Sequence, residues 1–281
     1  MSKKLFVVAT PIGNIREISN YAISVFSELT EFFCEDTRNS KKLFNLLNIS
    51  LTNKNFYTLN TINEEEIINK FNFKNEKYCL LSDAGYPVLS DPGFLLINHF
   101  IKNNWLINVV NGPSSLMHSL IVSGFQTKNT LFYGFLSNKK NIKETELNDL
   151  KKESKTIIIF ESVHRIKETL NLIKKIFDNT NRICIARELT KINETIYRCF
   201  IADVDKIEIV DKGEFVIVVD NNLQKDKKSE DNKNYFKFLN EVKNLILKGE
   251  KEKIACKIIA YKYNIKANLL YNFWQQQKNC I

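Results

Sequence analysis

Long apolar runs are missing from this sequence of 281 residues. No stretch approaches the roughly 20 uninterrupted apolar residues that a membrane-spanning helix needs. The N-terminus starts with lysines, but its apolar run is too short for a signal peptide and ends at Pro11. These absences predict a cytoplasmic protein that does not associate with a membrane.

Cysteine and histidine are scarce, with six and three residues. The cysteines lie at least 15 residues apart, so the Cys-x-x-Cys pairs of zinc and redox sites are absent. A cytoplasmic compartment keeps such isolated thiols reduced. We therefore expect no metal site.

Three common motifs of catalysis and nucleotide binding are also missing. The first apolar run is not followed by G-x-G-x-x-G, and G-x-x-x-x-G-K-S/T does not occur. G-x-S-x-G, which positions the nucleophile of α/β-hydrolases, is absent as well. The sequence therefore disfavours an ordinary dinucleotide site, a P-loop NTPase and a hydrolase of that type.

The segments that are present favour an α/β protein of more than one domain. Residues 1–125 alternate short apolar runs with amphipathic segments, which is typical of a parallel sheet covered on both faces. An acidic residue and a proline, Asp91-Pro92, suggest a helix start. The expected strands are 5–10, 32–34, 56–59, 78–82 and 106–110, and the expected helices are 21–29, 40–47, 64–71, 92–102 and 114–122.

Residues 126–220 form a second expected α/β domain. Several of its strands follow one another directly, which favours a mixed sheet. The expected strands are 131–135, 156–160, 182–186, 194–201 and 214–219, and the expected helices are 162–177 and 203–210.

The end of the chain is basic. Residues 221–281 contain 13 lysines and six acidic residues, so they carry +7 of the net charge of +9. The polar segment 221–234 is predicted to be a linker, followed over 235–281 by a basic module of three short helices. Its expected core consists of Phe236, Leu239, Val242, Ile254, Ile258, Leu270, Phe273 and Trp274. Such an appendage favours a polyanionic partner, although an AT-rich genome would also enrich lysine.

Proline and glycine are few, and they concentrate after the predicted strands of the first domain. All four prolines lie there, as do four of the eight glycines. Glycine allows a close backbone approach to a ligand, and open α/β sheets bind ligands at the carboxyl ends of their strands. The loops 10–14, 82–87 and 111–115 are therefore predicted to line one cleft.

Charged clusters follow three other strands and offer candidate catalytic groups. Cys34-Glu35-Asp36-Thr37-Arg38 suits either chemistry or a helix cap with a surface ion pair. In Ala186-Arg187-Glu188-Leu189-Thr190-Lys191, the basic residues could receive phosphates and Glu188 could accept a proton, but a solvated turn is as good an explanation. Phe160-Glu161-Ser162-Val163-His164-Arg165 joins a strand to a helix, and we expect His164 to be structural.

These motifs, in this order, resemble those of the ribosomal RNA small subunit methyltransferase I family, which belongs to the tetrapyrrole methylase superfamily. The matching segments are 7–14, 34–38, 82–87, 111–115, 161–165 and 186–191. The resemblance implies two α/β domains of tetrapyrrole-methylase type with a ligand cleft between them, and a homodimer. It also implies S-adenosylmethionine as methyl donor and the 2′-hydroxyl of a cytidine in small-subunit (16S) ribosomal RNA as acceptor, either free or in the 30S subunit.

The resemblance assigns residues to the donor site, namely Pro11, Ser82, Asp83, Ala84, Gly85, Pro87, Ser114, Ser115, Phe160, Glu161, Ala186 and Arg187. A ribose hydroxyl is a poor nucleophile unless its proton is accepted or its anion is stabilised. The candidates for this catalytic task are Glu35, Asp36, Glu188 and Lys191. Arg16, Arg38, Arg187 and the basic tail are expected to bind RNA phosphates.

Three positions depart from the family pattern. Asn111 and Val163 stand where the family has proline, and Tyr86 stands where it usually has threonine. Two other functions stay open, namely methylation of a small tetrapyrrole precursor and RNA binding without catalysis. The basic tail and the 34–38 cluster speak against the first function, and the Gly- and Pro-rich cleft speaks against the second.

Overall fold

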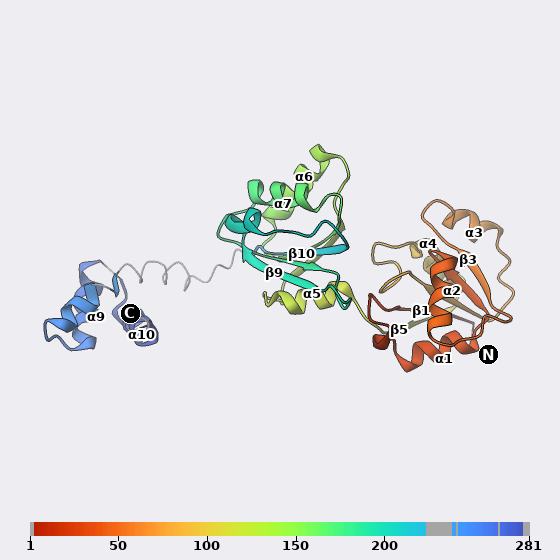
Figure 1. Ribbon diagram of the computed structural model, residues 1–281, viewed down its shortest axis with the longest axis horizontal. Coiled ribbons are helices and arrows are strands. Elements are labelled where there is room, and N and C mark those ends of the chain that lie inside the picture. The colour runs from red at the N-terminus through yellow and green to blue at the C-terminus, as the bar shows by residue number, and fades with distance from the viewer. Residues whose placement is uncertain (1–2, 223–237, 240, 264, 278–281) are drawn as a thin grey trace. The chain divides into compact units, whose positions relative to one another are not determined.

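The structure is a computed structural model that describes residues 3–222, 238–239, 241–263 and 265–277 (Figure 1). The chain divides into two compact units, residues 1–221 and 222–281. The first unit contains two five-stranded sheets, and the second is helical. Most of the predicted linker, residues 223–234, lies outside the described residues.

The first sheet is entirely parallel, as the apolar strands predicted. Its strand order is β3-β2-β4-β1-β5, and every neighbouring pair is parallel. The strands are β1 (Lys4–Val8), β2 (Glu31–Cys34), β3 (Asn55–Thr58), β4 (Lys77–Leu81) and β5 (Leu106–Val110). Alternate residues of β1 enter different cores, with Phe6 and Val8 on one face and Leu5 and Val7 on the other. Such a strand is buried on both sides and so lacks polar alternation.

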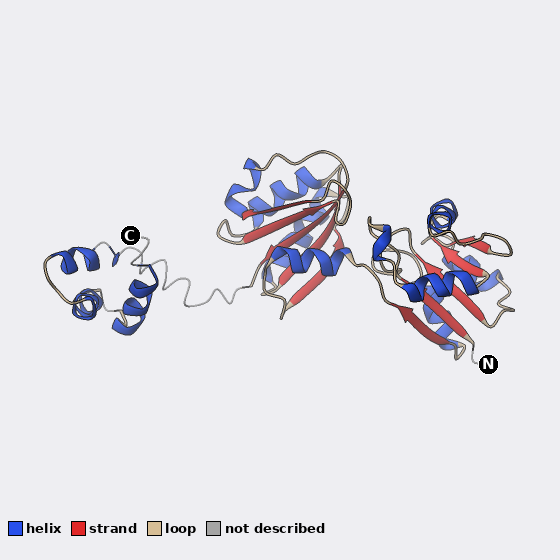
Figure 2. Cartoon of the chain, turned by 60° about the horizontal axis from the view of Figure 1, so that its bottom comes forward, coloured by secondary structure: helices blue, strands red, loops and turns tan. Residues whose placement is uncertain are grey.

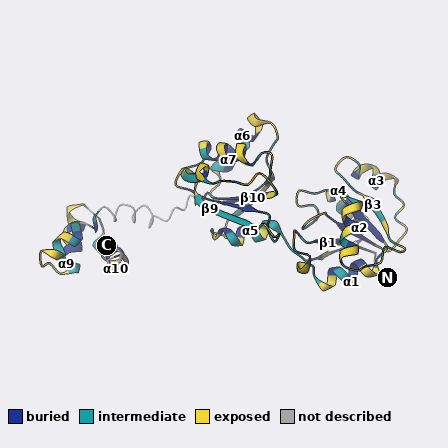
Figure 3. Ribbon diagram, in the orientation of Figure 1, coloured by how far each residue is buried: buried dark blue, intermediate teal, exposed yellow. Residues whose placement is uncertain are grey.

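Four helices supply the two cores of this sheet. On one face, α1 (Asn20–Glu28) and α2 (Thr37–Leu46) contribute Phe26 and Phe44. On the other, α3 (Glu64–Lys70) and α4 (Phe94–Lys102) contribute Leu96 and Phe100 among others. Figure 3 shows the consequence, since the three inner strands β2, β4 and β1 are mostly buried and the outer face of α2 is exposed. A short 3-10 helix (Ile15–Glu17) follows the loop after β1.

The second sheet is mixed, which confirms the expectation from its closely spaced strands. Its order is β6-β7-β10-β8-β9, with β6 and β7 parallel and the other three pairs antiparallel. The strands are β6 (Thr130–Phe135), β7 (Thr156–Ser162), β8 (Arg182–Arg187), β9 (Thr195–Phe200) and β10 (Glu214–Asp220). Figure 2 shows helices on both sides of these strands.

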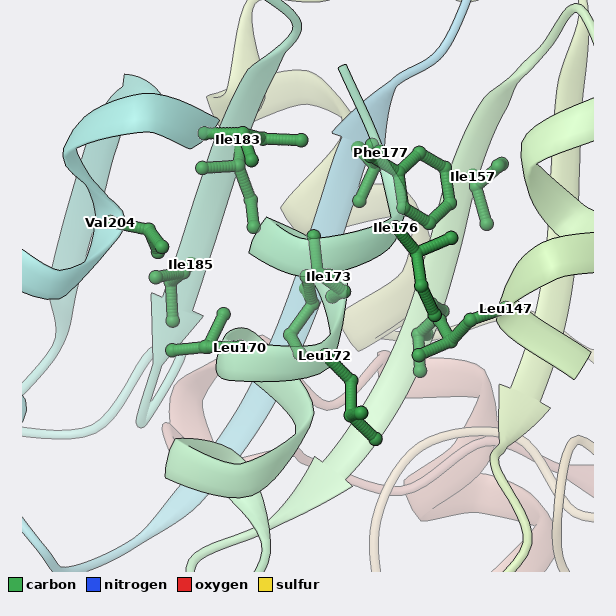
Figure 4. Packing of buried hydrophobic residues seen from close by; sticks show 14 of the residues in the cluster. Leu147, Ile157, Leu170, Leu172, Ile173, Ile176, Phe177, Ile183, Ile185 and Val204 are labelled. Atoms are coloured by element: carbon green, nitrogen blue, oxygen red, sulfur yellow. The ribbon is translucent and has the colours of Figure 1, made fainter. Parts of the chain in front are cut away.

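One face of the second sheet is covered by α6 (Lys140–Lys152) and α7 (Ile166–Ile176), whose apolar side chains pack as in Figure 4. The other face is covered by α5 (Ser115–Ser123), which contacts β10 and β8. Leu116 and Leu120 of α5 pack with the side chains of that face. The helix that follows the first sheet in sequence therefore packs on the second sheet in space.

Several element boundaries differ from the sequence expectations. The helix expected from Ser162 begins at Ile166, because β7 continues through Ser162. The segment 203–210 forms only a 3-10 helix, Ile201–Lys206. Helix α4 begins at Phe94 with Gly93 as its N-cap, so Asp91 does not cap it. Helix α6 was not expected, because its sequence is polar and only Lys143, Leu147 and Leu150 are buried.

The second unit has a small core of its own. Its helices include residues 241–247, α9 (Glu252–Lys262) and α10 (Ala267–Gln277). Among the expected core residues, Leu239, Val242, Leu270, Phe273 and Trp274 are buried. Ile254 and Ile258, also expected there, are exposed, because α9 buries Ala255, Cys256, Ile259 and Ala260 instead. Phe236 lies outside the described residues.

A buried lysine links α6 to α7. The side chain of Lys143 is 0% exposed, and its Nζ lies 2.9 Å from Oε2 of Glu168. The same ammonium group lies 3.4 Å from Oγ1 of Thr169, which donates a hydrogen bond to Glu161. A buried ammonium group is tolerated only when its charge is compensated. The ion pair to Glu168 is therefore a condition for this helix packing.

We predict that Glu168→Gln destabilises the first unit by about 2–3 kcal/mol, because it leaves the Lys143 charge buried without a counter-charge. This expected loss of stability is smaller than for a fully buried pair, because the Glu168 side chain is 45% exposed. The control is Glu144→Gln, which removes the exposed ion pair with Lys175 and should cost much less, because exposed ion pairs contribute little to stability. Urea unfolding measures both, and equal losses would contradict the prediction.

Candidate functional site

A pocket of about 410 Å³ opens among loops from both sheets of the first unit. The loops after β1, β2, β4 and β5 provide one part of its wall, and β6, β7, β8, β10 and their loops provide the rest. The lining consists of Ile12, Glu35, residues 83–86, 89–91 and 114–116, Phe135, residues 160–162, Ala186, Leu189 and residues 214–216.

The loop after β4 is fixed to the loop after β1 by backbone hydrogen bonds. Thr10 and Gly85 exchange two of them, with N···O distances of 2.9 and 3.1 Å. Gly85 has φ +76°, a conformation that favours glycine. The hydroxyl of Ser82 donates to the carbonyl of Gly85 in the same loop and also has a hydrogen bond with Asp91. The predicted donor loop is therefore rigid, with Ser82 as its internal brace.

Tyr86 joins the loop after β4 to the loop after β5. Its hydroxyl accepts a hydrogen bond from the backbone N–H of Gly112 at 3.1 Å. It also lies 3.3 Å from Oδ1 of Asn111, to which it donates. Two of the three positions that depart from the family pattern are thus in contact with each other.

The two parts of the wall meet where Gly13 approaches the turn between β8 and β9. A Cβ atom on Gly13 would lie 2.4 Å from Cγ of Lys191 and 2.7 Å from Oγ1 of Thr190. The backbone N–H of Asn14 donates to the same Thr190 oxygen at 3.0 Å. Ile12 and Leu189, which flank this contact, both line the pocket.

The pocket is acidic. Its described lining includes Glu35, Asp83, Asp91, Glu161 and Glu214, and no lysine, arginine or histidine. Burial, helped by the charges of Glu35 and Asp83 and opposed by a hydrogen bond with Ser82, raises the pKa of Asp91 to about 7. Partial burial and the charge of Asp83 also raise the pKa of Glu35. Such a wall favours a ligand with positive charge and disfavours a phosphate.

The structure brings most of the predicted donor residues to this pocket. Asp83, Ala84, Gly85, Ser114, Ser115, Phe160, Glu161 and Ala186 line it. Pro11, Ser82, Pro87 and Arg187 are not part of its described lining. Ser114 also caps α5 by accepting a hydrogen bond from the N–H of Met117.

Arg187 is held by the fold. It is buried, and its guanidinium donates to the carbonyl oxygens of Lys212 and Asn193. These two bonds use two of the five N–H groups of the guanidinium, and burial limits access to the others. The structure therefore favours a structural role for Arg187 over the two predicted binding roles.

Of the predicted catalytic residues, only Glu35 lines the pocket. Asp36 is the N-cap of α2 and forms an ion pair with Arg38 at 2.6 Å. The hydrogen bonds from Arg38 lower the pKa of Asp36 to about 2, which makes it a weak base. The alternative of a helix cap with a surface ion pair thus describes Asp36 and Arg38, whereas Glu35 faces the pocket.

Glu188 and Lys191 form an ion-pair network outside the described pocket lining. The ammonium of Lys191 lies 2.9 Å from Glu188 and 3.0 Å from Glu214. Although burial acts in the opposite direction, hydrogen bonds from Lys191 and from the Glu214 N–H lower the pKa of Glu188. These groups hold the turn that contacts Gly13, and neither is poised to exchange a proton near neutral pH.

The predicted phosphate-binding arginines 16 and 38 are exposed, and the side chain of Arg38 is 88% exposed despite its ion pair. A second hollow, of about 550 Å³, shares Phe135 and Ser162 with the pocket. It is also lined by Leu136, Ser137, Asn138, His164 and Arg165. This hollow, unlike the pocket, contains basic side chains.

Sequence reasoning missed several lining residues. Asp91 belongs to a further Pro- and Gly-containing loop, 91–93, so the signal that selected the other loops could have found it. The others give no comparable signal, because they are mostly apolar residues of strands or of loops that only the packing brings together. They are Leu89, Ser90, Leu116, Phe135, Ser162, Leu189, Glu214, Phe215 and Val216. Ile12 and Tyr86, by contrast, lie in the loops 10–14 and 82–87, which were predicted to line the cleft.

None of the helices within the described residues has the length and apolar character required to cross a membrane. In that same part of the chain, His, Cys, Asp and Glu side chains do not gather in threes where they could hold a metal ion.

Comparison with known proteins relates the chain to methyltransferases. The family described as Tetrapyrrole (Corrin/Porphyrin) Methylases matches residues 4–205. A protein of Mycoplasma genitalium named ribosomal RNA small subunit methyltransferase I is 42% identical, with 98% of this chain and 99% of that protein covered. Proteins of the same name from Haemophilus influenzae and Bacillus subtilis are each 32% identical and cover 96% and 95% of this chain, with 95% and 92% of their own lengths matched.

Solved structures share the fold at low identity. The methyltransferase CobJ has a TM-score of 0.55 at 11% identity and matches over 78% of this chain and 94% of its own. A uroporphyrin-III-C-methyltransferase from Thermus thermophilus has a TM-score of 0.54 at 13% identity, over 78% of this chain and 95% of its own. The fold is therefore of the tetrapyrrole-methylase type, with two α/β sheets and C-terminal helices.

We predict that Gly13→Ala displaces the 188–191 turn and destabilises the first unit by about 1–3 kcal/mol, as overpacking does. The added methyl would overlap the Lys191 side chain and the Thr190 hydroxyl. Urea unfolding and hydrogen exchange of the turn amides measure the two effects. Lys191→Ala removes the contact with Cγ but also the ion pairs of Lys191, so the reference for the double variant is Lys191→Ala alone, in which Gly13→Ala should cost less than in the wild type. Unchanged stability and exchange in Gly13→Ala would refute this close approach.

Proposed function

We propose that this chain methylates 16S ribosomal RNA. It belongs to the tetrapyrrole methylase family and, within that family, to the group named ribosomal RNA small subunit methyltransferase I. The methyl group is taken from S-adenosylmethionine and placed on the 2′-hydroxyl of a cytidine. The observation that carries the donor part of this proposal is the acidic pocket between loops of the two sheets.

The pocket suits S-adenosylmethionine by charge and by surface. The donor carries a positive sulfonium and a positive ammonium, which the carboxylates of Glu35, Asp83 and Asp91 would attract. Apolar side chains such as Ile12 and Val216 offer contacts to an adenine ring. The sulfonium supplies an activated methyl group, so the chain itself must bind, align and deprotonate.

An RNA acceptor is supported by the relatives and by the surface beside the pocket. Relatives named as ribosomal RNA methyltransferases match nearly the whole chain at 31–42% identity in several bacteria. The second hollow continues from the pocket through Phe135 and Ser162 and carries His164, whereas its Arg165 is paired with Glu161. We propose that the strand carrying the target nucleotide lies there, with its base against the half-exposed Phe135 ring.

The two alternative functions are less well supported. Solved methyltransferases named for uroporphyrin III and cobalt precorrin-4 match at only 13–14% identity, which shows a common fold and not a common substrate. A protein that only binds RNA would have no use for an acidic pocket, because carboxylates repel phosphates. We propose further that the chain acts in the cytoplasm as a homodimer on free ribosomal RNA or the 30S subunit, and sedimentation of the full chain tests the dimer.

The proposed function predicts that Ala84→Leu blocks the donor. Ala84 lines the pocket from an exposed loop, so a larger side chain should enter the pocket without disturbing a core. Donor affinity in calorimetry should fall at least about tenfold, because a bulky group would occupy space that the ligand needs. Transfer of labelled methyl groups to purified small subunits should fall with it.

The matched control is Ala202→Leu, which adds the same bulk at an exposed position outside the described lining. It should leave both measurements unchanged. The same labelled donor offered to naked ribosomal RNA and to tetrapyrroles tests the acceptor class. Transfer to tetrapyrroles alone would sink the RNA proposal, and undiminished donor binding by Ala84→Leu would remove this loop from the site.

We also propose that the helical unit helps to hold ribosomal RNA. The small core described above leaves Lys253 and Lys257 exposed on α9, one turn apart. Exposed lysines bind phosphates with release of counterions, so such binding weakens steeply with salt. The competing possibility is that these helices only dock one subunit to another.

A truncation that tests this role should end after Asn222 and not after Asp220. Asn221 is buried, and its amide donates to the carbonyls of Leu150, Lys151 and Glu153 at the end of α6. It also accepts a hydrogen bond from Asn181. Removal of Asn221 would therefore damage the first unit and confound the result.

We predict that truncation after Asn222 weakens RNA binding and flattens its salt dependence while donor binding is retained. In the full chain, Lys253→Gln with Lys257→Gln should reduce the slope of log affinity against log salt by about one unit for each phosphate that is no longer neutralised. Lys102→Gln with Lys128→Gln, two exposed lysines of the first unit, is the control. Equal affinities and slopes, with a change only in sedimentation, would favour docking instead.

A further inference from the structure

The carboxyl group of Asp91 is left without a capping role. The Asp91-Pro92 pair suggested a helix start, yet α4 begins at Phe94 and has Gly93 at its N-cap. The N–H of Leu96 in the first turn is satisfied by Glu64, whose Oε1 accepts it at 2.8 Å. Asp91 instead lines the acidic pocket.

The loop that carries Asp91 has an unusual backbone. Val88 and Ser90 have φ +74° and +78°, and the left-handed region is strongly disfavoured for a β-branched residue such as valine. Such conformations persist only where the surroundings enforce them. The Ser90 hydroxyl lies 3.2 Å from the position of a Cβ on Gly134, so the loop packs closely against β6. Asp91 is thus held in the pocket wall by both sheets.

The other carboxylates of the wall are largely occupied. Glu161 pairs with Arg165 at 2.6 Å and accepts from Thr169 at 2.6 Å. Glu214 pairs with Lys191 at 3.0 Å. Both oxygens of Asp83 accept hydrogen bonds, one from the N–H of Asp36 and one from the amide of Asn39. Glu35 has one hydrogen bond with the backbone of Asp83, and Asp91 has one with Ser82, but neither is in a described ion pair. They remain as candidate bases, and Glu35 is the more exposed of the two.

We propose that Asp91 is the proton acceptor for the methylated hydroxyl, an inference that rests on the proposed function. The acceptor oxygen forms a bond to the methyl carbon while the carbon–sulfur bond breaks and its electron pair stays on sulfur. The hydroxyl proton passes to the Asp91 carboxylate, which later releases it to water. No further reactant is needed, because the donor leaves as a neutral thioether.

The environment of Asp91 suits this task. A general base works best when its pKa lies near the working pH, because it is then both deprotonated and sufficiently basic. Burial and the charges of Glu35 and Asp83 raise the pKa of Asp91 to about 7. By contrast, Asp36 has its pKa lowered to about 2 and would accept a proton poorly.

The pH dependence has a definite sign. Below its pKa of about 7, Asp91 is protonated and cannot accept a proton, so methyl transfer should slow as the pH falls. A positively charged donor in the pocket favours the carboxylate and so lowers this pKa. Near neutral pH, donor binding should therefore release a fraction of a proton. The other charged groups facing Asp91 across the pocket are Glu35, Asp83, Glu161 and Glu214.

The test compares Asp91→Asn with the full-length wild-type chain. Single-turnover transfer at saturating donor is followed over a pH series on both sides of the Asp91 pKa. The variant should lose at least about 100-fold in rate, as loss of a general base does, together with the acid limb of the profile. Calorimetry of donor binding in two buffers of different ionisation enthalpy should show proton release in the wild type and none in the variant, with affinity changed only a few-fold.

Two further variants separate the explanations. Asp211→Asn, which removes an exposed partner of Lys167 outside the described lining, should behave as the wild type. Glu35→Gln should keep the acid limb. If Asp91→Asn keeps its rate and its acid limb, or if the limb disappears with Glu35→Gln instead, the proposal is overturned while the proposed function stands. Failure of the wild-type chain to methylate small subunits would overturn both.

Discussion

The pocket depends on one close approach, in which Gly13 lies so near the turn between β8 and β9 that a Cβ atom has no room. Neither sheet encloses a ligand alone, because each contributes only part of the lining. The contact places Ile12 from one sheet and Leu189 from the other in the same wall. The ion pairs of Lys191 with Glu188 and Glu214 hold this turn, so these charged residues affect the site by fixing the position of the backbone.

Charge is distributed so that basic groups near the pocket are used by the fold. Arg187 binds backbone carbonyls, Arg165 pairs with Glu161, and Lys191 pairs with Glu188 and Glu214. The described wall is left with carboxylates, three of which are not paired with a basic side chain in any described ion pair. One fold can in this way offer a cation-binding pocket on a chain of net charge +9. The two ligands of a methyl transfer to RNA have opposite charge, and the protein separates the surfaces that attract them.

The sequence predicted what local patterns determine and missed what packing determines. The order of apolar strands and amphipathic helices along the chain was sufficient to predict the parallel sheet and the mixed sheet. The Gly- and Pro-rich loops were sufficient to predict residues of the pocket wall such as Asp83 and Ser115. Helix α6 was missed because its few buried positions include Lys143, whose burial depends on Glu168 across the helix pair. Asp36 and Asp91 show the same limit, since both are acidic residues beside predicted helices. Only the structure shows that the first caps a helix and the second faces the pocket.

The contact between Tyr86 and Asn111 changes the meaning of two sequence departures. Taken singly, Asn111 removes the stiffness of a proline, and Tyr86 adds a large ring beside the donor loop. In the structure the ring hydroxyl accepts from the N–H of Gly112 and donates to Asn111, so it ties the loop after β4 to the loop after β5. A Cβ atom on Gly112 would lie 3.0 Å from the Cβ of Ala9, so the second loop packs closely against the residue that follows β1. A side-chain hydrogen bond between two loops can restrain both, whereas a proline restrains only its own backbone. The two substitutions are therefore best understood as one structural unit that keeps the pocket wall in place.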